Sequence, residues 1–89
     1  MNIKKLYCMR KELSPFLVVD YYATVCTDAA NNRRYGICIE ASGKSSVDTY
    51  ISAGICRTSK EAYSFAKKLA MYTVTPINAE ECIDELLAA

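Results

Sequence analysis

The chain has 89 residues, of which 52% are hydrophobic and 24% are charged, and this balance predicts one small globular domain spanning residues 1–89. The formal net charge is +1, so overall charge favours neither nucleic-acid binding nor mimicry of a nucleic acid. Histidine is absent, which excludes Ser–His and Cys–His nucleophile pairs and histidine metal ligands.

The sequence contains neither a membrane-spanning pattern nor a secretory signal. No apolar stretch approaches the ~20 residues that a transmembrane helix needs, and the lysines near the N-terminus are not followed by an apolar core of the required length. The cysteines number five and include no closely spaced pair, as is normal for reduced thiols. We therefore expect a cytoplasmic protein that does not contact membranes.

Residues 1–15 fit two alternatives. Their apolar positions, at 3, 6, 7, 9 and 13, match a helix about as well as a short strand. A strand is favoured because no residue before them could cap a helix, so we expect an N-terminal arm or an edge strand. Ser14-Pro15 ends this segment.

Residues 16–51 predict an antiparallel sheet. The segment 16–27 alternates at period two and is rich in β-branched and aromatic residues, and the Asp- and Asn-rich segment 28–32 predicts a turn. A returning strand over 33–42 would keep the apolar sides together. The register that achieves this pairs Tyr21 with Ile39, Ala23 with Ile37, Val25 with Tyr35, Tyr22 with Cys38, and Cys26 with Arg34.

A third strand is predicted over residues 47–51. Its alternation places Val47, Thr49 and Ile51 toward the core. Gly54 is expected to mark a break before the helices that follow.

Residues 58–89 predict a pair of helices. Thr58 and Glu61 form a capping box, in which the Thr58 hydroxyl accepts from the Glu61 N–H and the Glu61 carboxylate accepts from the Thr58 N–H. This helix runs from about residue 59 to 72, and Pro76 follows its end. The second helix, over about 79–88, is capped by Asn78, and Ile77 is expected to pack on Cys82.

These elements define an α+β fold. The order of strands followed by helices predicts a three- to four-stranded antiparallel meander, with the two C-terminal helices packed on one face.

The uncovered face of this sheet is a candidate interface. It combines apolar and charged side chains around a tyrosine, which is a composition typical of association surfaces. We expect a partner protein or a second copy of the chain, as in a homodimer, to contact Val18, Tyr22, Cys38, Arg34 and Glu40, with Tyr22 near the centre. In the alternative, residues 1–13 fold across this face and complete the core.

Two charged surfaces are further candidates. Glu81, Asp84 and Glu85 form an acidic surface on the second helix, although exposed charge is the normal state of a helix surface. A basic surface could stack single-stranded nucleic acid between tyrosines if the N-terminal arm and the 28–34 turn lie on one side, but the net charge makes this partner unfavourable. The basic residues are Lys4, Lys5, Arg10, Lys11, Arg33 and Arg34.

No motif in the sequence indicates catalysis. The cysteines lack zinc-site spacing, and the three glycines match no phosphate-binding loop. We therefore expect no catalytic residue, cofactor or metal ion, and no enzymatic activity.

Several short segments resemble an uncharacterised family, a domain of unknown function in short proteins from Gram-positive bacteria and their mobile elements. The resemblance spans roughly residues 17–89 and implies no known activity and no catalytic residue. The segments are Tyr21-Tyr22, Tyr35-Gly36-Ile37, Ile51-Ser52, Val74-Thr75-Pro76-Ile77 and Ile83-Asp84-Glu85-Leu86-Leu87.

The sequence therefore favours a small non-enzymatic cytoplasmic module for protein interaction or regulation, which acts by binding another protein. One alternative is a nucleic-acid-associated protein that uses the basic N-terminal arm and hairpin. Another is an inhibitor, encoded by a mobile element, of a host or phage protein.

Overall fold

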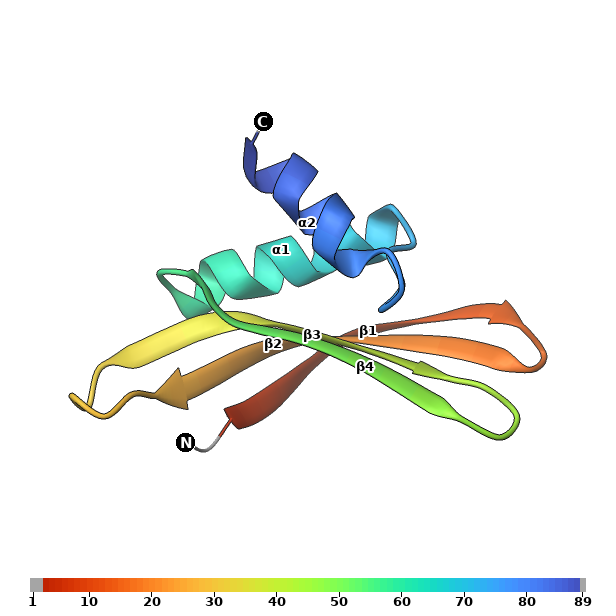
Figure 1. Ribbon diagram of the computed structural model, residues 1–89, viewed down its shortest axis with the longest axis horizontal. Helices are drawn as coiled ribbons and strands as arrows, with labels where there is room; N and C mark the ends of the chain where they lie inside the picture. Colours follow the sequence, from red (N-terminus) through yellow and green to blue (C-terminus); the bar gives the residue numbers. More distant parts are fainter. Residues whose placement is uncertain (1–2, 89) are drawn as a thin grey trace.

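The computed structural model describes residues 3–88, so residues 1 and 2 of the predicted arm and residue 89 of the helix pair lie outside the described residues. Four strands form one antiparallel meander in the order β1-β2-β3-β4, and the helices α1 and α2 lie on one of its faces (Figure 1). The predicted α+β fold is confirmed. The elements are β1 (Ile3–Ser14), β2 (Leu17–Thr27), β3 (Arg33–Ser42), β4 (Val47–Cys56), α1 (Ser59–Met71) and α2 (Ala79–Ala88).

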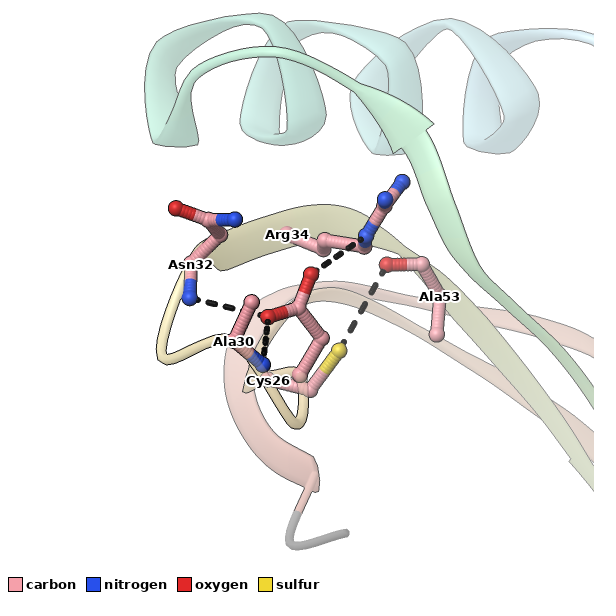
Figure 2. Close-up of polar contacts among 6 residues, drawn as sticks. Cys26, Ala30, Asn32, Arg34 and Ala53 are labelled. Carbon is pink, nitrogen blue, oxygen red and sulfur yellow. Dashed lines mark hydrogen bonds and ion pairs between the residues drawn. The ribbon is translucent and has the colours of Figure 1, made fainter.

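The central hairpin of β2 and β3 has the predicted register, with Tyr21 opposite Ile39 and Ala23 opposite Ile37. Its turn depends on the Asp28 carboxylate, whose Oδ1 accepts hydrogen bonds from the Ala30 and Asn32 N–H groups at 3.0 and 2.9 Å (Figure 2). Asparagine tolerates the left-handed backbone that the tight turn requires, and φ at Asn31 is 64°.

The N-terminal segment is an edge strand, and two bulges explain why its pattern was ambiguous. The register of β1 against β2 shifts at Cys8 and again at Leu13. Each shift inserts one residue and changes the phase of the alternation. Cys8 and Met9 therefore both contact the helix-covered side: Met9 packs against the core, and the Cys8 thiol lies 3.9 Å from the Tyr63 carbonyl of α1.

The prediction that Val47, Thr49 and Ile51 point inward is wrong. β3 and β4 pair Ile39 with Tyr50 and Cys38 with Ile51, and because directly paired residues share a face, Tyr50 lies on the core side. Those three side chains therefore lie on the open face, the side of the sheet without helices. The aromatic Tyr50 packs against the core, which the short alternating pattern did not reveal.

β4 continues past Gly54, where a break was expected, because it bulges over β3. Between the pairs Ile37–Ser52 and Tyr35–Cys56, three residues of β4 stand opposite the single residue Gly36. A Cβ atom on Gly36 would lie 1.9 Å from the Ser52 carbonyl oxygen and 2.7 Å from the Ala53 carbonyl carbon. Only glycine fits beneath this crossing backbone.

The bulge brings β4 toward β2. Figure 2 shows the Cys26 thiol of β2 directed at the Ala53 carbonyl of β4, at 3.9 Å. Cys26 is consequently buried, although it lies on the face without helices.

The core lies between the sheet and α1. Alanines at 62, 66 and 70 let α1 approach the sheet closely, and Leu69 completes its buried stripe. Most of the buried strand residues come from β2 and β3, since β1 and β4 are edges. α2 rises away from the sheet over α1 and adds Ala79 and Ile83 to the core (Figure 1).

The helix starts are placed as predicted, but their capping bonds differ in part. The Thr58 hydroxyl accepts from the Glu61 N–H at 3.1 Å, as expected, whereas the Glu61 carboxylate accepts from the Arg57 N–H and not from Thr58. Asn78 Oδ1 accepts from both the N–H and the hydroxyl of Thr75. Asn78 thus closes the turn before α2.

The expected packing of Ile77 on Cys82 is wrong. The Ile77 side chain is 90% exposed, because the turn between Thr75 and Asn78 carries it outward. In the described part of the chain, neither helix is long and apolar enough to cross a membrane.

The crossing at Gly36 generates a matched pair of substitutions. Gly36→Ala should destabilise the fold by more than about 3 kcal/mol, the upper end of usual overpacking costs, because the obstructing atoms are backbone. Gly54→Ala is the control, since its Cβ would lie 3.7 Å from the nearest atom, Arg34 Cδ, in ordinary contact. Denaturant melts measure the free energy of unfolding of both variants. Equal stability of the two would contradict the close passage of β4 over Gly36.

Candidate functional site

The register places the predicted interface residues on the open face, but it does not leave them all accessible. Cys38 is 0% exposed and cannot contact a partner through its side chain, so its assignment to an interface is wrong. Val18, Tyr22 and Glu40 are half-buried, and Arg34 is exposed. The reason is that β1 lies beside β2 and its long side chains cover much of this face.

Tyr22, the expected centre of the interface, lies beneath two residues of β1. The Lys5 ammonium is 5.1 Å from the centre of the Tyr22 ring, and the Tyr7 ring meets it edge-on at 5.5 Å. Lys5 also pairs with Glu40 at 2.9 Å. Burial, followed by the nearby Glu40 carboxylate, raises the pKa of Tyr22. The N-terminal segment thus partly covers this face from an adjacent strand.

A second ion pair, between Arg10 and Asp20, lies on the other half of the same face. Asp20 is only 7% exposed, and its Oδ1 accepts from Arg10 Nε at 2.8 Å and from the Tyr7 hydroxyl at 3.2 Å. These charges satisfy one another within the chain, so they offer little to a partner without first being separated. We call Lys5, Tyr7, Arg10, Asp20, Tyr22 and Glu40 the open-face network.

The six basic residues do not form one surface. Successive strand residues point to opposite faces, so Lys4 and Lys5 diverge, as do Arg10 and Lys11. Ile3 pairs with Cys26 near the 28–32 turn, whereas Arg10 pairs with Asp20 toward the other end of the sheet. Only the first residues of the N-terminal arm therefore lie near the 28–32 turn.

Arg33 and Arg34 do come together in a shallow hollow of about 430 Å³, where Arg57 joins them. Sequence reasoning missed Arg57, which precedes the N-cap residue of α1, Thr58. Arg34 is partly neutralised there, because its Nε lies 3.2 Å from the Asp28 carboxylate.

The cysteines are free thiols in the structure. Burial raises the pKa of Cys38 to about 11 and also raises the pKa values of Cys8 and Cys56, which disfavours the reactive thiolate. Among residues 3–88, no group of three or more His, Cys, Asp or Glu side chains is placed to hold a metal ion.

Three exposed apolar side chains lie at the end of α1 and in the segment that follows it. Met71 is 71% exposed, Tyr72 is 61% exposed and Ile77 is 90% exposed, all within seven consecutive residues. We call these three residues the connection surface. Beside it lies a hollow of about 380 Å³, lined by Tyr72, Val74, Cys82, Glu85 and Leu86.

One of the predicted acidic residues, Glu85, lies beside this surface. Glu81, Asp84 and Glu85 are all exposed on α2, and Glu85 forms part of the wall of the hollow. Glu81 lies in the first turn of α2, which begins at Ala79. The structure therefore combines the acidic helix with an apolar surface that sequence reasoning had not assigned.

A buried hydrogen bond from the sheet holds the segment that carries the connection surface. The buried Tyr21 hydroxyl of β2 donates to the Val74 carbonyl at 2.7 Å. At the end of α1, the Thr73 N–H bonds to the Ala70 carbonyl and the Val74 N–H to the Leu69 carbonyl, which is the Schellman pattern of helix termination. The segment after α1 is thus held in one conformation.

Thr73 adopts a strained backbone at the centre of this segment. Its φ is 53°, in the left-handed region that favours glycine and that β-branched residues rarely adopt. Lys11 Nζ donates to its hydroxyl at 3.1 Å, which ties the segment to β1. The left-handed conformation belongs to the helix termination described above, where glycine is the usual residue.

One signal in the sequence pointed to this surface. Met71 and Tyr72 lie outside the buried stripe of α1, so their apolar side chains had no assigned contact. Ile77 was assigned to a helix-start contact and was therefore not considered as an exposed residue.

Comparison with known proteins identifies the family of the chain. The model of a family of unknown function, DUF6514, matches residues 3–89, so the chain belongs to that family. No curated protein and no solved structure matches it.

Tyr21→Phe tests the anchor of the connection surface. The variant leaves the buried Val74 carbonyl unpaired and should lose about 1–3 kcal/mol of stability near neutral pH. Burial raises the pKa of Tyr21 from 10.0 to about 12, so this stabilisation is complete below pH 10 and is lost as the pH rises toward 12. Denaturant melts at several pH values measure the difference, and a difference that stays constant up to pH 12 would contradict this role.

Proposed function

We propose that this member of the DUF6514 family is a non-enzymatic module that binds another protein through the connection surface. The observation that carries the proposal is the exposure of Met71, Tyr72 and Ile77 beside an apolar hollow. Binding of this kind would serve to regulate or inhibit the partner.

The exposed side chains supply the energy for binding. Burying an isoleucine that is now almost fully exposed contributes about 1.5–3 kcal/mol. Tyrosine is enriched among the few residues that dominate interface energetics, and methionine adapts to irregular partner surfaces. Because the Tyr21–Val74 bond already holds the segment, little ordering entropy is lost on binding.

The charges indicate the chemistry of the partner. The carboxylates of Glu81, Asp84 and Glu85 lie on the helix that borders the apolar surface, and the described part of α2 has no basic residue in its last turn. A partner segment that offers an apolar anchor flanked by lysine or arginine would complement both features. Such charges would raise the association rate and make it sensitive to salt.

Capture experiments with matched variants test this proposal. Immobilised parent protein, incubated with a lysate of the cells that encode it, should retain a partner that Ile77→Asp fails to retain. Phe16→Asp serves as the control, because Phe16 is also apolar and 65% exposed but lies next to Lys44 at the turns of the sheet. Quantitative mass spectrometry of the retained proteins compares the three baits.

The purified partner should then bind Glu85→Lys at least about tenfold more weakly than the parent, equivalent to about 1.4 kcal/mol. Equal retention by Ile77→Asp and Phe16→Asp would overturn the proposal. So would capture that no substitution in the connection surface alters.

A further inference from the structure

The two edges of the sheet differ in their protection against pairing with another strand. β1 carries two bulges and five charged residues, features by which natural sheets prevent edge association. The first half of β4 has a regular register from Val47 to Ile51 and one charged residue, Asp48. β4 is therefore the edge that is open to strand addition.

This part of β4 exposes apolar side chains. Val47 is 62% exposed and Ile51 is 45% exposed, and both lie on the open face. Within the described range Val47–Cys56, every residue is exposed or half-buried. The strand thus presents an unpaired backbone edge together with apolar side chains.

The order of the side chains is self-complementary. An antiparallel copy of β4 centred on Thr49 would pair Val47 with Ile51, Asp48 with Tyr50, and Thr49 with itself. Apolar and Thr–Thr cross-strand pairs are favourable, and like charges do not meet. A copy centred one residue earlier would place Asp48 opposite Asp48 and is disfavoured for that reason.

We propose that β4 pairs with β4 of a second copy of this chain, antiparallel and centred on Thr49. Two four-stranded sheets then form one continuous eight-stranded sheet with the helices of both copies on the same side. The same residues serve on both subunits, as a two-fold interface requires.

The structure also limits the assembly to two copies. The bulge opposite Gly36 interrupts the regular edge after Ser52, so the paired segment is short. β1 ends the sheet on the other side of each copy with bulges and charges, which prevents growth into a fibre. A weak, closed dimer follows from these two features.

This inference is independent of the proposed function. Lys11 of β1 contacts Thr73, so the connection surface lies toward the β1 edge of the sheet, and β4 forms the opposite edge. Failure of one proposal leaves the other standing.

A charge exchange tests the pairing and its register. Val47→Lys/Ile51→Lys and Val47→Glu/Ile51→Glu each place like charges opposite one another in the proposed dimer. Each variant alone should dimerise at least about tenfold more weakly than the parent, or about 1.4 kcal/mol. An equimolar mixture should regain association, because each lysine then faces a glutamate.

Sedimentation velocity over a concentration series measures these dissociation constants, and circular dichroism melts check that each variant folds. If a double variant does not fold, Thr49→Lys replaces it, because position 49 meets its own copy in the dimer. The proposal is overturned if the parent remains monomeric at millimolar concentration. It is also overturned if folded variants dimerise as the parent does, or if mixing restores nothing.

Discussion

The hydrogen bond from Tyr21 to the Val74 carbonyl joins the centre of the sheet to the segment between the helices. Tyr21 is fully buried, so its hydroxyl needs this partner, and Val74 sits where α1 has just ended. The bond ties the residue that follows the left-handed Thr73 to the sheet, so the end of α1 is attached to β2. The exposed side chains on either side of Val74 thereby become a defined surface, whereas an unanchored loop would lose entropy on binding.

The open face and the helix side of the molecule differ in their polar contacts. We infer that the first surface is structural and the second functional. On the open face, Lys5 pairs with Glu40, and Arg10 pairs with Asp20, so the side chains stabilise the sheet and cover Tyr22. On the helix side, the connection surface has apolar groups, and α2 beside it carries exposed carboxylates. A face that satisfies its own charges excludes partners, while an apolar surface bordered by one sign of charge favours a complementary one.

Most of the fold could be predicted because local patterns and tertiary packing agree there. The alternation in β2 and β3 determined their register, and Thr58 marked the start of α1. The sequence-based predictions failed where an inserted residue or a backbone crossing changes the alternation of side chains along a strand. The bulge at Cys8 obscured β1, and Gly36 allows β4 to cross above it, which no local rule for glycine predicts. The candidate surface was missed because Ile77 fits a helix-start contact locally, and only the turn closed by Asn78 directs it to solvent.

Photocrosslinking inside the cells that encode the chain tests the central claim most directly. A photoreactive amino acid replaces either Ile77 in the connection surface or Tyr7 in the open-face network, which are both exposed positions. The account predicts that illumination links a discrete partner to the chain at position 77 and not at position 7. Crosslinking at position 7 with none at position 77 would show that partners bind the open face, and it would contradict the account.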